Sequence, residues 1–161
     1  MLVSGPLVQA DQCPVEILLV DSRRLVRAGI VRVLSDSGFL VVANEASSCD
    51  EAIRLARKQP PQLVLVNLPG STVDMLDGVR KMHRQFPDIG VLVLSDESDL
   101  IIQERLLQAG IAGCLSSSCS VEELFAALDA VLKGERYISD SLARKLAERR
   151  LPGNGKTPFD Q

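Results

Sequence analysis

The sequence predicts an α/β protein in which a parallel β-sheet is covered by helices on both faces. Two observations carry the prediction. Short aliphatic runs of strand length recur along the chain, and an amphipathic segment of helical periodicity follows each of them. The 161 residues are also 46% hydrophobic and 24% charged, which is enough apolar material for one buried core. Because only 3% of the residues are aromatic, that core is expected to be aliphatic.

Five strands are expected from the aliphatic runs, which are rich in Val, Leu and Ile. They span residues 15–21, 39–46, 63–67, 89–96 and 112–117. The apolar residues of the first helix are expected to share one face, and Gly38 is expected to end that helix. These apolar residues are Leu25, Ile30, Val33 and Leu34. Ser48 and Ser120 precede two later helices and are predicted to be their N-caps.

The chain is predicted to hold one domain with short flanking segments. The alternation of strands and helices places that domain at residues 15–135. Residues 136–150 are expected to form a sixth, C-terminal helix with Asp140 as a plausible cap. Residues 1–14 are interpreted as a flexible leader, and residues 151–161 have the composition of a linker.

Charge and cysteine usage argue against several classes of function. The net charge is −3, and the basic run at 144–150 contains a Glu, so it is interpreted as a solvated helix face rather than a nucleic-acid patch. No CxxC pair accompanies the single His, which disfavours a zinc site. No apolar run approaches the ~20 residues of a membrane span. We therefore expect a reduced, cytoplasmic protein that binds neither membrane nor nucleic acid through these residues.

Polar residues are predicted to gather where the strands end. In an open parallel sheet, the carboxyl ends of the strands meet at one crevice. The residues expected there are Asp21, Ser22, Asn67, Ser95 and Ser117. No GxGxxG follows the first strand, so a dinucleotide site is not expected. The only imidazole, His83, falls in a helix, which leaves no nucleophile–base pair and disfavours an enzyme.

Several segments of the chain resemble the receiver domain of two-component response regulators. They are "ILLVDSRRLVRAGIVRVL", "PQLVLVNLPG", "DGVRKMHRQFPDIGVLVLSD", "RLLQAGIAGCLSSS" and "AVLKGERYIS". The resemblance covers about residues 15–150 and is strongest to the NarL/FixJ (LuxR-type) branch, within it the GacA/UvrY group. It implies a CheY-like, flavodoxin-like doubly wound sheet of five parallel strands in the order 2-1-3-4-5.

The resemblance also implies roles for the polar residues. Family members phosphorylate themselves on an aspartate at the end of the third strand, with Mg²⁺ held near the first strand. Here Asp21 and the hydroxyl of Ser95 are retained, while Asn67 stands at the phosphoacceptor position. Ser22 stands where the family has its second acid, and Ser117 where it has its lysine. Cys114 stands at the position of the aromatic that commonly swings inward on activation.

These replacements predict a degenerate receiver without catalytic residues. The amide of Asn67 is a poor nucleophile, and Asp21 alone is a weak anchor for Mg²⁺, so cofactor binding is expected to be weak or absent. Asn67 is alternatively a satisfied buried polar group without signalling meaning. Asp74 or Asp77 could be substitute acceptors, and Cys114 with Cys119 a redox switch, but both ideas are disfavoured because the aspartates lie beyond the loop and no cation activates the thiols.

The expected function is phosphorylation-independent signalling or transcriptional regulation through protein contacts. A homodimer is expected, or a heterodimer with a related response regulator, formed through helix faces. The apolar residues available for such a contact are Leu25, Val26 and Val33 in the first helix and Val121, Leu124 and Leu128 in the fifth. Two alternatives stay open: the regulatory half of a LuxR-type DNA-binding transcription factor, and a receiver that binds a small molecule in the vestigial pocket.

Overall fold

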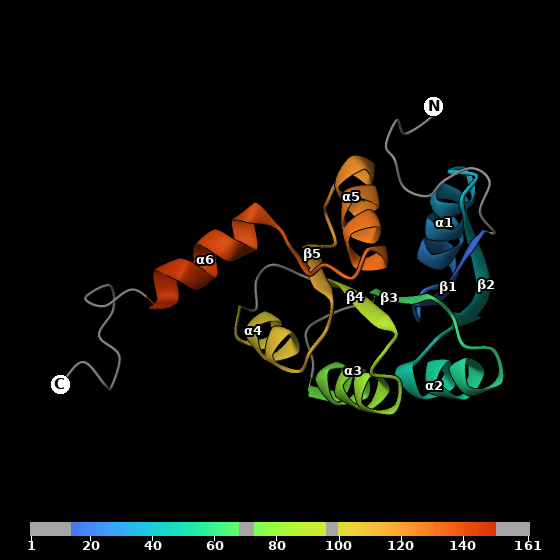
Figure 1. The fold of residues 1–161 in the computed structure, drawn as a ribbon, viewed down its shortest axis with the longest axis horizontal. Coiled ribbons are helices and arrows are strands. Elements are labelled where there is room, and N and C mark those ends of the chain that lie inside the picture. The colour runs from blue at the N-terminus through green and yellow to red at the C-terminus, as the bar shows by residue number, and fades with distance from the viewer. Residues whose placement is uncertain (1–13, 68–72, 96–99, 151–161) are drawn as a thin grey trace.

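A computed structural model describes residues 14–67, 73–95 and 100–150 of the chain. It contains one parallel sheet in the order β2-β1-β3-β4-β5-β6, alternating with helices (Figure 1). The strands are β1 (Val15–Val20), β2 (Leu40–Ala46), β3 (Leu63–Asn67), β4 (Gly90–Ser95), β5 (Gly113–Ser116) and β6 (Tyr137–Ile138). The helices are α1 (Arg24–Ser35), α2 (Cys49–Lys58), α3 (Val73–Gln85), α4 (Leu100–Gln108), α5 (Val121–Leu132) and α6 (Asp140–Arg150). The predicted α/β class and the order of the first five strands are confirmed.

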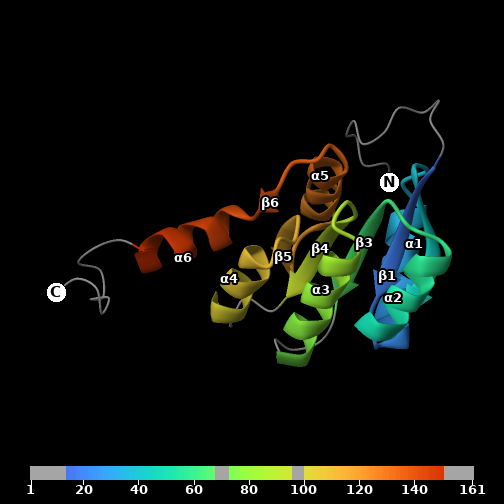
Figure 2. The same cartoon turned by 60° about the horizontal axis from the view of Figure 1, so that its bottom comes forward.

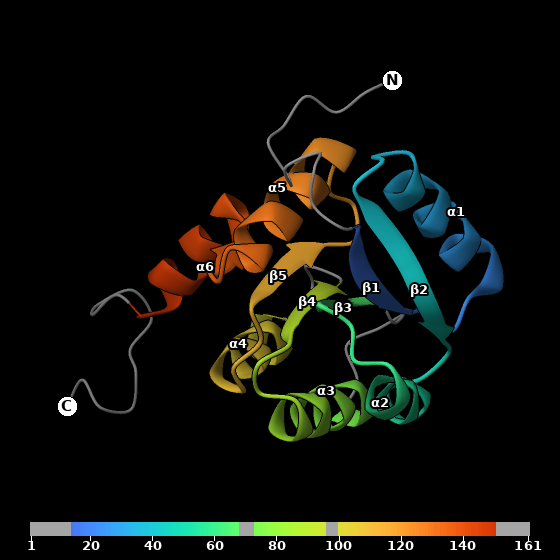
Figure 3. The same ribbon diagram turned by 45° about the vertical axis from the view of Figure 1, so that its right-hand side comes forward.

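The helices form two layers, one on each face of the sheet. Helices α1 and α5 cover one face, and α2, α3 and α4 cover the other (Figures 1 and 3). Strand β3 shows why its sequence is continuously apolar. Val64 and Val66 pack under α2, α3 and α4, whereas Leu63 and Leu65 pack under α1 and α5. Because successive side chains point to opposite faces, a strand covered on both faces needs apolar residues at every position.

Two of the predicted N-caps form as expected. The hydroxyl of Ser48 accepts a hydrogen bond from the backbone N–H of Glu51 at 3.2 Å. The hydroxyl of Ser120 does the same for Glu123 at 3.0 Å. Each bond satisfies a backbone donor that the first turn of a helix leaves without a partner. These caps fix where α2 and α5 start.

One prediction about α1 is wrong. Leu25 was expected on the buried face, but 86% of its surface is exposed. A helix turns ~100° per residue, so a residue five positions before Ile30 points ~140° away from it. Leu34 is buried, and Ile30 and Val33 pack against the same core, as predicted. Leu25 instead projects from the first turn of the helix.

The C-terminal part of the described chain contains a strand that the sequence did not predict. Tyr137 and Ile138 pair with Gly113 and Cys114 at the edge of β5 (Figure 2). The approach is close, because a Cβ on Gly113 would lie 2.7 Å from the carbonyl oxygen of Tyr137. The predicted sixth helix therefore begins at Asp140 rather than at residue 136.

Helix α6 packs against α4 on the face that α2 and α3 also cover. Leu142 and Leu146 are buried in the same hydrophobic cluster as Leu106 of α4. Arg149 makes an ion pair with Glu104 of α4 at 3.4 Å. The helix is thus joined to the core rather than set apart from it.

The predicted leader, apart from Pro14, and the predicted tail at 151–161 lie outside the described residues. Among the helices that the structure describes, none combines the length and apolarity needed to cross a bilayer.

Candidate functional site

Three polar side chains lie at the carboxyl edge of the sheet. Asp21 directly follows β1, Asn67 ends β3 and Ser95 ends β4. Parallel pairing brings these strand ends into register, with Asn67 opposite Leu94. All three side chains are buried, although each follows a run of purely apolar residues. This edge is where ligands bind in open α/β sheets, so it is the candidate site.

The carboxylate of Asp21 accepts hydrogen bonds from both Arg23 and Asn67. Its Oδ2 atom accepts a hydrogen bond from Nδ2 of Asn67 at 3.0 Å. Its Oδ1 atom accepts one from the backbone N–H of Arg23 at 2.8 Å, a local turn typical of Asp. The guanidinium of Arg23 also contacts both oxygens, with Nε 3.2 Å from Oδ1 and Nη2 3.4 Å from Oδ2. A buried carboxylate requires such partners, because burial without them is strongly unfavourable.

Asn67 satisfies only one end of its amide. While Nδ2 donates to Asp21, the buried Oδ1 atom has no hydrogen-bond partner among the described residues. The orientation is set by Asp21, since the opposite one would turn an oxygen toward a carboxylate. An unpaired buried acceptor costs ~1–3 kcal/mol. The alternative interpretation of Asn67 as a satisfied polar group therefore holds for its nitrogen but not, within the described structure, for its oxygen.

Ser95 belongs to a second, uncharged group. Its hydroxyl accepts a hydrogen bond from Nε2 of Gln103 in α4 at 3.0 Å and lies 3.5 Å from the sulfur of Cys114 in β5. Gln103 is buried and was missed by the sequence reasoning. Its position three residues before the buried Leu106 was the available signal, because that spacing places both residues on the inner face of α4.

Ser22 and Ser117, the two other predicted site residues, lie at the same edge but do not join either group. The structure describes both as exposed. The backbone N–H of Ser117 donates to the carbonyl oxygen of Ser95 at 2.9 Å. Residue 117 therefore lies next to the uncharged group that contains Ser95. No hydrogen bond of either hydroxyl to Asp21, Asn67 or Ser95 is found in the described structure.

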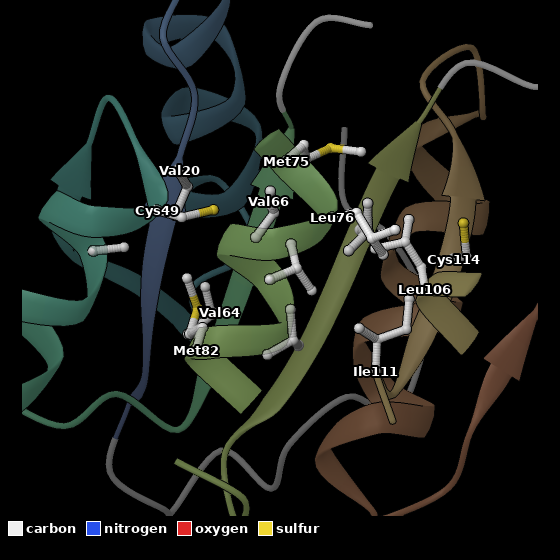
Figure 4. Close-up of a cluster of buried hydrophobic side chains, with 14 of the residues drawn as sticks. Val20, Cys49, Val64, Val66, Met75, Leu76, Met82, Leu106, Ile111 and Cys114 are labelled. Carbon is white, nitrogen blue, oxygen red and sulfur yellow. The ribbon is translucent and has the colours of Figure 1, made fainter. Parts of the chain in front are cut away.

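Cys114 is a packed side chain in the hydrophobic cluster under α3 and α4 (Figure 4). Burial raises the pKa of its thiol, and the hydrogen bond with Ser95 offsets this only in part. Burial also raises the pKa of Cys49, to about 11, with Asp50 adding to the effect. Cys119 has a raised pKa too, through burial and the nearby Glu123. The three cysteines that the structure describes, Cys49, Cys114 and Cys119, are free thiols.

The described residues do not fit a divalent cation at this edge. Mg²⁺ is usually held through one or two carboxylates in octahedral geometry. Among the described side chains of the site, Asp21 supplies the only carboxylate, and the guanidinium of Arg23 already contacts both of its oxygens. No group of three or more His, Cys, Asp or Glu side chains suited to a metal occurs within residues 14–67, 73–95 and 100–150.

The fold and the buried acid at the end of β1 define the class of protein. The response regulator receiver domain family matches residues 17–129 of the chain, and the chain belongs to that family. This agrees with the resemblance seen in the sequence and with the observed strand order.

Three similar proteins show which members of the family this chain resembles. The response regulator GacA of Pseudomonas syringae is 36% identical over 147 residues, which cover 91% of this chain and 69% of the relative. The response regulator UvrY of Escherichia coli K12 is 32% identical over 146 residues, covering 90% of this chain and 67% of the relative. A two-component response regulator of the LuxR family from Aurantimonas sp. superposes with a TM-score of 0.78 at 28% identity, covering 86% of this chain and 99% of that one.

Proposed function

We propose that this chain is a receiver domain that signals without being phosphorylated, through contacts with another response regulator subunit. The observation that carries the proposal is the pairing of Asn67 with Asp21. The residue at the end of β3 is an amide, and its nitrogen donates to the buried acid at 3.0 Å. A carboxylate in place of Asn67 would face Asp21 with like charge and would need a cation between them.

The chemistry of the edge supports the same proposal. An amide oxygen is a poor nucleophile toward phosphorus, so Asn67 lacks the reactivity of an acceptor carboxylate. Ser117, next to Ser95, carries no positive charge with which to stabilise a transferring phosphoryl group. Asp77, considered as a substitute acceptor, is exposed and lies near Arg80 at 4.0 Å on α3. Asp77 is therefore not one of the buried groups of the site.

Exposed apolar residues supply a surface for a protein partner. Leu25 and Val26 of α1 and Val121 of α5 are exposed, and these two helices cover the same face of the sheet (Figure 3). Leu124 and Leu128 of α5 are buried against the sheet and are not available for a contact. The interaction surface is therefore assigned to the N-terminal turns of α1 and α5.

The relatives support a role in transcriptional regulation. GacA and UvrY are response regulators of which the aligned segments cover 69% and 67%. The present chain would then act as the regulatory part of a longer LuxR-type regulator that binds DNA through a separate domain. The length of the natural reading frame tests this part of the proposal directly.

Phosphorylation is tested by incubating the protein with acetyl phosphate and Mg²⁺ and measuring its intact mass. We expect no phosphoryl adduct under conditions in which an intact GacA receiver is fully labelled. A stable adduct on the wild-type chain would contradict the proposal.

Two variants test which of the replaced residues prevent phosphorylation. Asn67→Asp alone is expected to gain little labelling, because Ser22 and Ser117 still lack the acid and the lysine. The triple variant Asn67→Asp, Ser22→Asp, Ser117→Lys is expected to label, because it restores the acceptor, the acidic pair and the positive charge together. Efficient labelling of the single variant would mean that the other two positions matter less than proposed.

Pairing is tested by size-exclusion chromatography with light scattering, alone and with a GacA receiver. Leu25→Ser is expected to weaken the complex, because it removes an apolar side chain that is 86% exposed. Val41→Ser is the matched control, because Val41 is also exposed but lies on β2 at the edge of the sheet. A monomer that ignores the relative would contradict this part of the proposal.

A further inference from the structure

The cation that balances Asp21 belongs to the protein itself. Asp21 is fully buried, whereas the side chain of Arg23 is 43% exposed and extends from solvent onto the carboxylate. Its Nε and Nη2 atoms reach one oxygen each, and its backbone N–H binds Oδ1 as well. A planar guanidinium suits this two-pronged contact better than any other side chain.

A second arginine holds the same residue from the next turn of α1. Nη1 of Arg27 donates to the backbone carbonyl oxygen of Asp21 at 2.6 Å, and its Nε pairs with Glu45 at 2.9 Å. Asp21 is thus contacted by two arginines, one at the side chain and one at the backbone. Positive charge so close to the carboxylate opposes the approach of a divalent cation.

We propose that Arg23 is a built-in counter-ion that occupies Asp21 in place of a metal ion and makes the site insensitive to divalent cations. The inference deepens the proposed function and rests on it, since a phosphoryl-accepting receiver needs its acidic edge open to such a cation. Arg23 acts here as a positioning residue, through Asp21, and not through contact with a substrate.

The unpaired oxygen of Asn67 gives the proposal a specific consequence. With Arg23 shortened, both carboxylate oxygens of Asp21 would lose the guanidinium and keep only the bonds from the backbone N–H of residue 23 and from Nδ2 of Asn67. A cation bound there would be joined by Oδ1 of Asn67, which lacks a partner in the described structure, once the amide turns over. Carboxylate and amide oxygens are ligands that hard divalent cations accept. Removing the arginine is therefore expected to create a weak cation site, rather than only to loosen the fold.

The test is titration with Mn²⁺, followed by the enhancement of water proton relaxation. We expect no specific binding by the wild-type protein, and binding by Arg23→Ala at least about tenfold tighter than by the control. The control is Arg24→Ala, which removes the same charge from the neighbouring residue, for which the structure shows no contact with Asp21. Adding Asp21→Asn to Arg23→Ala is expected to abolish the gain.

Two further variants separate charge from structure. Arg23→Lys keeps the positive charge. We therefore expect this variant, like the wild-type protein, not to bind Mn²⁺. If Arg23→Ala does not fold, as judged by circular dichroism, Arg23→Gln takes its place in the same titration. The inference is overturned if the charge-removing variant binds Mn²⁺ no better than Arg24→Ala, or if the wild type already binds as tightly.

The two proposals fail in distinguishable ways. A wild-type protein that is inert to acetyl phosphate, together with an Arg23→Ala variant that gains no Mn²⁺ binding, overturns the role of Arg23 alone. A phosphoryl adduct on the wild-type chain overturns the proposed function, whatever the Mn²⁺ titration shows.

Discussion

The two sides of the site differ in how they hold a buried polar group. On the acidic side, Asp21 is balanced by charge, through Arg23, and by the amide of Asn67. On the hydroxyl side, Ser95 is held by the neutral groups of Gln103 and Cys114. Both sides stand at the carboxyl ends of neighbouring strands in the same sheet.

On the acidic side, groups of the chain itself neutralise and hydrogen-bond the buried carboxylate, so this side needs no external ligand. A buried charge is tolerated there because the chain brings its own counter-charge from the start of α1. The hydroxyl side needs none, because each of its members is neutral and hydrogen-bonded to another. The orphaned Oδ1 of Asn67, between the two, is the atom at which this balance is incomplete.

The largest expected effect comes from putting a second charge on the acidic side. Asn67→Asp replaces the donor to Asp21 with a carboxylate, and we expect the free energy of unfolding at pH 7 to fall by ~2–4 kcal/mol. Like charge raises the pKa of the folded pair above its unfolded value. The loss is therefore absent below about pH 4 and grows as the pH rises.

Urea denaturation of this variant between pH 4 and pH 8 measures the effect. Asn44→Asp on β2 is the control, because the amide of Asn44 donates to the exposed side chain of Gln59 rather than to a buried acid. We expect that control to change stability by less than ~0.5 kcal/mol. A pH-independent loss in Asn67→Asp would mean that the amide matters for packing rather than for charge.

A smaller effect is expected from removing the counter-ion. Arg23→Ala should lower the free energy of unfolding by ~1 kcal/mol, a modest value because Arg23 is partly exposed and screened by solvent. Arg24→Ala should change it by less than ~0.5 kcal/mol. The effect of Arg23→Ala should shrink as NaCl is raised, because salt screens the pair. A loss that ignores salt would contradict a role for charge.

The hydroxyl side should respond more weakly and without salt dependence. A double-mutant cycle of Ser95→Ala and Gln103→Leu measures the coupling between the two side chains, expected to be ~0.5–1.5 kcal/mol for one neutral hydrogen bond. Repeating the cycle at high salt should leave the coupling unchanged. A coupling that disappears at high salt would mean that charge stabilises the hydroxyl side as well, so the two sides would not differ in this respect.

The last prediction concerns the reactivity of the cysteine thiols and involves no change in stability. Cys114 and Cys49 should resist alkylation at pH 8 in the folded protein, because burial raises both pKa values and only the thiolate reacts. With a pKa of about 11, only about one Cys49 thiol in a thousand is ionised at that pH. Peptide mass spectrometry before and after addition of urea measures this; rapid labelling of native Cys114 would revive a redox role.

The strands were predictable because their composition reports their surroundings. Val64 and Leu65 face opposite layers of helices, so both must be apolar, and a continuous aliphatic run follows. Caps such as Ser48 were predictable for a similar reason, since the bond they make is local. Strand β6 was not, because two residues carry too little pattern and their pairing depends on Gly113, distant in the sequence.

The sequence by itself determined the class of fold, the family and the residues that reach the carboxyl edge, because these follow from periodicity and from local motifs. Only the tertiary structure decided how those residues pair. Asp21 and Asn67 are 46 positions apart, and no local pattern shows that the amide nitrogen faces the acid. The same holds for Gln103, which α4 brings onto Ser95. Hydrogen bonds depend on distance and direction in space, and the packing of helices against the sheet sets both.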